Sequence, residues 1–198
     1  MHSTLTLPLN YEPVRTIDLS KDKALLINLS VASLILFFVF GFLFTILAGA
    51  LSPALSHSGS VTITLPTFLL SLVVVSAITV FVMVIHELIH GIFFWLFTRS
   101  KPKYGFKGIY AYAAAPDWYI PRNQFLVIGL APLIILTLLG FVLFRFLPPL
   151  GIFIDVFGMT LNAAGAVGDI FIVALLLRKP ASCLFRDFGT AITVYRSK

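Results

Sequence analysis

The chain has one cysteine, Cys183, among 198 residues, and few charged side chains. A single thiol excludes an intramolecular disulfide, and without a Cys-x-x-C pair a cysteine-based metal or redox site is excluded as well. Charged residues make up 11% of the chain and hydrophobic residues 59%, whereas an ordinary soluble domain is about 25% charged. The composition therefore predicts a multi-pass protein of the cell membrane, in which any metal must be bound by His and carboxylate side chains.

Four apolar stretches are each long enough to cross a bilayer as a helix, and they cover about 25–50, 67–98, 124–147 and 152–177. Helices are required in lipid because backbone groups find no other partners there, and four spans cannot close a barrel. The remaining residues are too few for a sizeable soluble domain. The sequence thus predicts an all-α membrane protein, a single domain over 1–198 built as a bundle of four transmembrane helices.

The basic residues alternate with these stretches. Lys and Arg precede the first stretch, fill the connection between the second and the third, and return in the C-terminal tail. The loop 51–66 has none, and the connection at Pro148 and Pro149 is expected to have none. By the positive-inside rule, both termini and the second connection should be cytoplasmic. This distribution accounts for the net charge of +6, so we expect the lipid bilayer as a partner and no nucleic acid.

The second connection, roughly 99–123, is rich in aromatic residues and has two interpretations. Tyr and Trp side chains are typical of the membrane interface, where they anchor a chain. Alternatively, the stretch 108–113 forms a short strand near the site and offers backbone hydrogen bonds to an extended peptide.

The motif His86-Glu87-Leu88-Ile89-His90 lies in the second apolar stretch, with no other charged residue between Pro66 and Arg99. On a helix, two histidines four residues apart lie on one face and can share a metal ion. Neutral imidazoles leave Zn²⁺ acidic enough to bring a bound water to a pKa of about 7, and Glu87 can take the proton. A polar cluster that fixes helix packing is the alternative, but ionisable groups at membrane depth usually mark function. The motif predicts one Zn²⁺ per chain, with Glu87 as the catalytic base.

A catalytic zinc site needs a third protein ligand, and spacing favours Asp169. His90 precedes Arg99 by nine residues, and Asp169 precedes Arg178 by nine. Both stretches should run in the same direction, so at 1.5 Å per residue both groups lie about 13 Å from the cytoplasmic boundary. Asp117, in the second connection, is the alternative.

The fourth stretch places small and polar residues on one side of a helix. Gly158, Asn162, Gly165 and Asp169 follow spacings of four, three and four, and the glycines permit close helix packing. Asn162 is expected to bind substrate backbone, to orient a metal ligand, or to hydrogen-bond another helix. We also consider Asp117 a candidate substrate-binding residue.

These residues resemble the membrane family called putative zincin peptidases and, more distantly, the site-2 intramembrane metalloproteases. The resemblance covers most of the chain, through 86–91, 101–107, 115–118 and 162–169. In site-2 proteases the third ligand is an Asp on a later helix, usually followed by Gly in an N-P-D-G-like motif, and the resemblance gives that role to Asp169. Here Gly168 precedes Asp169 and no Pro is adjacent.

Taken together, motif and resemblance predict a zinc-dependent peptidase that cleaves a peptide or membrane-protein substrate within or beside the membrane. The alternative is a non-catalytic membrane factor, with the same helix bundle, that binds a metal or assists assembly.

Overall fold

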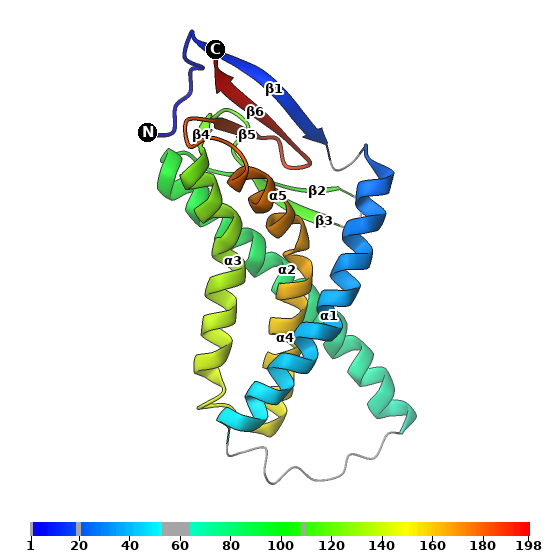
Figure 1. The fold of residues 1–198 in the computed structure, drawn as a ribbon. Coiled ribbons are helices and arrows are strands. Elements are labelled where there is room, and N and C mark those ends of the chain that lie inside the picture. Colours follow the sequence, from blue (N-terminus) through cyan, green and yellow to red (C-terminus); the bar gives the residue numbers. More distant parts are fainter. Residues whose placement is uncertain (1, 19–20, 53–63, 108–109) are drawn as a thin grey trace.

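The computed structural model describes residues 2–18, 21–52, 64–107 and 110–198. Within these ranges the chain is mostly helical, and Figure 1 shows long helices with strands gathered at one end. The helices are α1 (Lys23–Leu51), α2 (Leu65–Thr98), α3 (Arg122–Leu143), α4 (Pro149–Gly165) and α5 (Val167–Leu177). The strands are β1 (Tyr11–Asp18), β2 (Lys103–Lys107), β3 (Tyr110–Ala114), β4 (Ile120–Pro121), β5 (Leu184–Asp187) and β6 (Ala191–Ser197).

The described helices give three to four candidate membrane spans. α1, α2 and α3 are each long and apolar enough to cross a membrane. α4 and α5 pass the same test only as a pair, and they are bent by 44° where they meet at Ala166. The predicted spans agree with the first two helices, but α3 ends at Leu143. Arg145 therefore lies in a connection that was expected to have no basic residue.

α2, which carries the histidine motif, has defined ends. Thr64 caps its N-terminus, where Thr64 and Thr67 form a reciprocal capping box, and Pro66 occupies the first turn. The C-terminal cap is Arg99, in a left-handed conformation with φ of 56°. The two caps define where the helix that carries the histidine motif begins and ends.

The prediction of an all-α chain is wrong at both termini. β1, near the N-terminus, pairs with the C-terminal strand β6, and the sheet continues through β5 to β4 in the order β1-β6-β5-β4. All these pairings are antiparallel, and Tyr11 lies opposite Ser197. The terminal segments form strands because their β-branched and aromatic residues are buried: Val194 packs with residues of the helices, and Tyr195 packs with Tyr11 and Leu184 of the same sheet.

The prediction of a short strand in the second connection is confirmed, and its pairing with a peptide stays a prediction. β2 and β3 form an antiparallel hairpin in which Tyr104 pairs with Ala113, and β3 packs against α2. Two residues of the predicted strand, Gly108 and Ile109, lie outside the described part of the chain.

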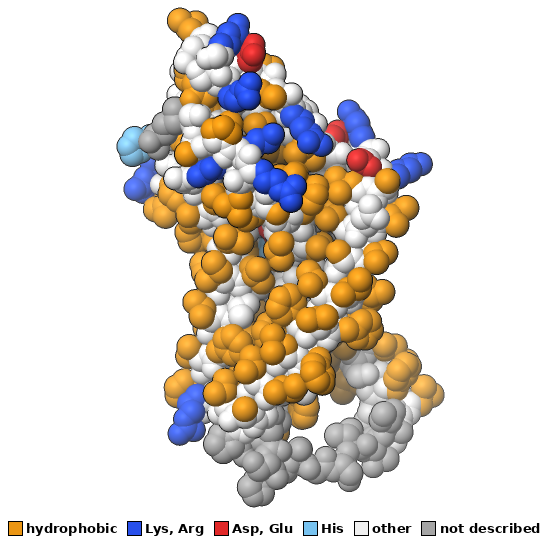
Figure 2. Space-filling model, viewed as in Figure 1, with side chains coloured by type: hydrophobic (Ala, Val, Ile, Leu, Met, Phe, Trp, Pro, Cys, Tyr) orange, Lys and Arg blue, Asp and Glu red, His pale blue; other side chains and the backbone are white. Residues whose placement is uncertain are grey.

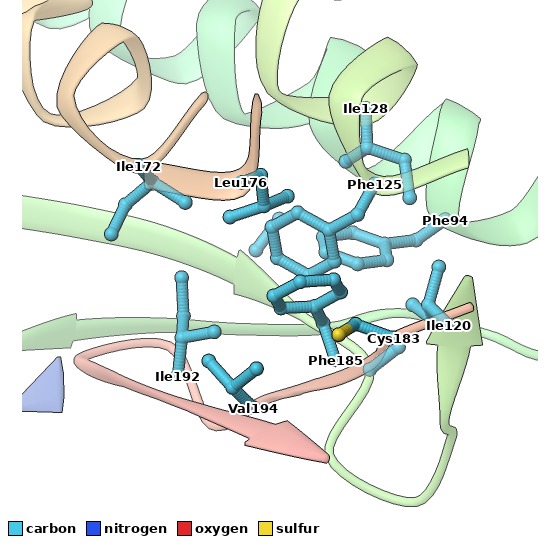
Figure 3. Packing of buried hydrophobic residues seen from close by; sticks show 12 residues of the cluster. Phe94, Ile120, Phe125, Ile128, Ile172, Leu176, Cys183, Phe185, Ile192 and Val194 are labelled. Carbon is cyan, nitrogen blue, oxygen red and sulfur yellow. The ribbon is translucent and has the colours of Figure 1, made fainter. Parts of the chain in front are cut away.

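A hydrophobic cluster joins the four-stranded sheet to the helices. Phe125 of α3 contacts Phe94 of α2, with ring centroids 6.3 Å apart, and Phe185 of β5 at 5.8 Å. Ile172 and Leu176 of α5 complete the contact from the helical side (Figure 3). The cluster holds β5 against α2, α3 and α5.

The charged side chains are unevenly distributed. Lys and Arg gather at the strand end of the molecule, while hydrophobic side chains cover the helices (Figure 2). All Lys and Arg residues except Arg145 lie in the strands, in the segments next to them, or at the first residue of α1 or α3. This agrees with the expectation that the termini and the second connection lie on one side of a membrane.

Candidate metal centre

α2 brings the two histidines of the motif together. The ring centroids of His86 and His90 are 4.9 Å apart, one helical turn along the same face. The two residues are 9% and 7% exposed, respectively. Two buried imidazoles at this spacing can bind the same metal ion.

Asp169, in the first turn of α5, meets both histidines. Its Oδ2 lies 3.0 Å from Nε2 of His86, and its Oδ1 lies 3.4 Å from Nε2 of His90. One ligand atom from each of the three residues lies within 4.8 Å of the others. His90 and Asp169 thus meet in the structure, and their common depth in a membrane stays a prediction.

Each imidazole is held through Nδ1 by a neighbouring helix, and both Nε2 atoms point toward Asp169. Nδ1 of His90 lies 2.9 Å from the carbonyl oxygen of Ile128, and Nδ1 of His86 lies 2.8 Å from Oδ1 of Asn162. These oxygens only accept, so each Nδ1 donates a proton to its partner. Each Nε2 faces an oxygen of Asp169, and a metal ion bound between them would take the place of the proton that they share. Two imidazole nitrogens and a carboxylate are the donor set of a catalytic zinc site with a fourth position for water. The residues therefore fit a zinc ion.

Pro132, inside α3, explains why the carbonyl of Ile128 accepts from His90. In a helix this carbonyl would accept from the N–H of residue 132, four positions later, but proline has no N–H. The unpaired carbonyl takes the imidazole N–H instead. A residue that disturbs the helix thus orients one metal ligand.

Asn162, on α4, is 2% exposed and holds the other histidine. Its Nδ2 donates to the carbonyl oxygen of Pro132 at 3.4 Å, so its Oδ1 faces His86. Of the roles expected for Asn162, this geometry supports two, the orientation of a ligand and a hydrogen bond to another helix. A contact with substrate stays a prediction.

Asn162→Ala should lower zinc affinity by about 10- to 100-fold, because an imidazole without its second hydrogen bond is poorly oriented. Competition with a zinc-binding dye measures the change. Asn28→Ala, at an exposed position of α1, is the matched control and should bind zinc as the wild type does. Equal affinity of Asn162→Ala and the control would show that the amide does not orient His86.

Pro132→Ala should separate metal binding from stability. The new N–H at residue 132 competes with His90 for the Ile128 carbonyl, so zinc affinity should fall by about tenfold. The metal-free variant should unfold at the same or a higher temperature than the wild type, because proline disfavours a helix interior. A variant with unchanged zinc affinity would contradict this role of the proline.

Glu87 lies beside the metal group and is held from the hairpin. Its side chain is partly buried, and the backbone N–H of Ala113 in β3 donates a hydrogen bond to it. A Cβ at Gly91 would overlap the hydroxyl of Tyr104. The glycine after the histidine motif thus leaves room for this side chain of β2 beside α2.

The site opens into a cavity of about 710 Å³. Its lining includes His86, Glu87, His90, Asn162 and Asp169, and further residues of all five helices and of β3. The turn between β5 and β6 also contributes. The candidate residues from the second and fourth apolar stretches therefore share one space.

Asp117 lies elsewhere. Its carboxylate pairs with Nζ of Lys103 at 2.9 Å, both side chains are about 60% exposed, and Asp117 is outside the cavity lining. The histidines meet Asp169 and not this alternative third ligand. A part for Asp117 in substrate binding stays a prediction.

Sequence reasoning missed two contributors to the site, Pro132 and Asp187, and it predicted the strand that contains Ala113 without its contact to Glu87. Pro132 orients a ligand, the backbone of Ala113 holds the proposed base, and Asp187 of β5 lines the cavity. The proline left a local signal in the sequence, because Pro in an apolar helix always leaves the carbonyl four residues earlier without its donor.

Comparison with known proteins agrees with the geometry. The family model described as putative zincin peptidase matches residues 79–184, which include the histidine motif, the hairpin and Asp169. No curated protein and no solved structure matches the chain. The matched region covers more than half of the sequence, and the chain belongs to the putative zincin peptidase family.

Proposed function

We propose that this protein is a zinc-dependent membrane peptidase, with one Zn²⁺ on His86, His90 and Asp169 and with Glu87 as the catalytic base. The observation that carries the proposal is the meeting of two imidazole Nε2 atoms and a carboxylate beside Glu87. Membership of the zincin family supports the same chemistry.

In the proposed mechanism, Glu87 moves the proton. Zinc, when bound, polarises the scissile carbonyl and acidifies a water molecule. Glu87 takes a proton from the attacking water and passes it to the departing amine. Ala113 N–H holds the carboxylate during both transfers, and the hydrogen-bonded histidines need no rearrangement.

The edge of β3 that faces away from β2 is the proposed site for the substrate backbone. The N–H of Ala113 points toward Glu87 and away from β2, and in an antiparallel strand the backbone groups of Ala111 share that direction. Both alanines line the cavity. An extended peptide can pair with this edge beside Glu87, so we expect cleavage of substrate segments that unwind readily.

The proposed setting is the cell membrane. We infer that α4 and α5 act as one broken span, so that the chain crosses the bilayer four times with both termini in the cytoplasm. The bend between α4 and α5 and the basic residues at the strand end support this arrangement (Figure 2). Water then reaches the cavity from the strand end.

The proposal is tested with purified protein in detergent. Zinc-loaded protein should cleave a peptide library, 1,10-phenanthroline should abolish the activity, and added Zn²⁺ should restore it. Mass spectrometry of the products measures cleavage. Tight binding of one zinc with no cleavage of peptides or of membrane substrates with helix-breaking residues would favour the non-catalytic membrane factor.

A further inference from the structure

Asp187, the last residue of β5, adds a third carboxylate to the cavity that contains Glu87 and Asp169. It is 8% exposed, and it interacts electrostatically with both of these carboxylates and with His90. Among the described residues, the group that can hold a metal consists of His86, His90 and Asp169. Asp187 therefore has no part in the chemistry proposed above.

The local structure uses one oxygen of this carboxylate. Oδ1 of Asp187 accepts a hydrogen bond from the N–H of Gly189 at 2.7 Å. Gly189 has a φ of 87°, and a Cβ there would overlap the ring of Tyr112 on β3. The turn, and with it the carboxylate, is thus fixed against the hairpin. An amide oxygen would accept the same bond without burying a charge, so the turn by itself does not require an acid.

The positive group that interacts with Asp187 is His90, a proposed metal ligand, and no Lys or Arg among the described lining residues balances its charge. Arg186, next in the chain, donates to the carbonyl of Pro116 and lies over the ring of Tyr119. The nearest basic residue in sequence is therefore engaged elsewhere.

The surroundings of Asp187 favour a cationic ligand. Burial raises the pKa of Asp187 to about 7, and Asp169 and Glu87 act in the same direction. A bound divalent ion would face three carboxylates with only two positive charges. A positively charged group entering the cavity would stabilise the ionised form of Asp187.

Asp187 lies at the end of the molecule where a membrane substrate would present Lys or Arg side chains. The residue lies in the sheet, at the end of the molecule where Lys and Arg gather (Figure 2). Transmembrane segments carry Lys and Arg at their cytoplasmic ends. A substrate segment that follows the edge of β3 would bring its basic flank toward this end of the cavity.

We propose that Asp187 determines specificity by binding a Lys or Arg side chain of the substrate. The substrate class is then a peptide or membrane segment with a basic residue on the strand side of the cleaved bond. This inference rests on the proposed peptidase function, and it concerns selection of the substrate and not the chemical step.

The cleavage sites of a peptide library test the proposal. Wild-type protein should prefer Lys or Arg at one position near the cleaved bond, and Asp187→Asn should reduce this preference at least tenfold. Glu12→Gln removes a carboxylate from the same sheet, outside the cavity, and should keep the preference. Cleavage by the wild type without a basic preference, or a preference that survives in Asp187→Asn, would overturn the inference.

A binding measurement separates this inference from the peptidase proposal. The probes are fluorescent peptides of one Ala and Ser based sequence in which a single Lys or a single Gln moves along the chain. In the Glu87→Gln background, the best Lys peptide should bind at least tenfold more tightly than its Gln partner. The ratio should fall to about one when Asp187→Asn is added. Equal binding of Lys and Gln peptides with Asp187 present would overturn the inference, even where the protein cleaves nothing.

The variant should fold, because Asn keeps an oxygen acceptor for the N–H of Gly189. Zinc content and melting temperature of Asp187→Asn should match those of Glu12→Gln. The comparison of Lys and Gln peptides on protein with Asp187 intact needs no such variant, so it tests the proposal even if Asp187→Asn does not fold.

Discussion

Glu87→Gln should lower kcat for peptide hydrolysis by about 10²- to 10⁴-fold, the usual contribution of a general base, and should leave about one zinc per chain. Gln is nearly isosteric with Glu and can still interact with the backbone of Ala113, but it cannot take a proton from water. Metal content is expected to persist because Glu87 is not part of the metal-binding group. Steady-state kinetics and elemental analysis on the same preparation measure both effects.

Glu87→Asp gives a graded control. The carboxylate remains basic but lies one methylene further from the reacting atoms, so part of the activity should return relative to Glu87→Gln. A Glu87→Gln protein with kcat within about threefold of the wild type would contradict the assignment of the base. Loss of zinc together with activity would indicate that Glu87 acts through the metal site.

Asp169→Ala should lower zinc affinity by more than about 100-fold, because it removes a direct ligand, and the loss of a residue that only orients a ligand already costs about 10- to 100-fold. The carboxylate contacts Nε2 of both His86 and His90. Without it, the proposed site keeps two protein ligands. Titration with a competing chelator measures the affinity, and peptide hydrolysis at limiting zinc should fall in parallel.

Two further substitutions make the Asp169 result specific. Asp155→Asn changes another acidic residue of the same bent helix pair, outside the cavity lining, and should leave zinc affinity unchanged. Asp117→Ala removes the alternative third ligand and should also leave it unchanged. If Asp117→Ala loses zinc while Asp169→Ala keeps it, the third ligand comes from the hairpin region and the contact at Asp169 is only a hydrogen bond.

Much of the metal centre was predictable because it depends on regular helix geometry. Spacing by four residues places His86 and His90 on one face of any helix. Equal distances to Arg99 and Arg178 place His90 and Asp169 at one depth without knowledge of the contacts. Both inferences use only the rise and periodicity of a helix, and the distances between these side chains agree with them.

The break in the fourth apolar stretch was not predicted. A continuous helix would have kept Asn162 and Asp169 on one stripe, yet the chain bends by 44° between α4 and α5. Both side chains still reach His86, one at each ring nitrogen. The small residues of this stretch indicated close packing, and packing alone does not specify where a helix bends.

The four-stranded sheet was missed because its pairing is not local. Tyr11 lies opposite Ser197, at nearly the two ends of the sequence, and no local pattern encodes this register. β-branched and aromatic residues such as Ile192, Val194 and Tyr195 were a signal for a strand, but hydropathy led us to treat the termini as tails. Because the sheet was missed, Asp187 was missed as well, since it lines the cavity only because β5 packs against the helices.

The central claim is that His86, His90 and Asp169 bind one divalent metal ion, and X-ray absorption at the zinc edge tests it most directly when combined with elemental analysis of purified wild-type protein. The account predicts one zinc per chain, with two imidazole nitrogens at about 2.0–2.1 Å and a carboxylate oxygen at about 2.0–2.2 Å. Protein that is folded and exposed to zinc yet binds none, or binds it without imidazole in the first coordination shell, would contradict the account.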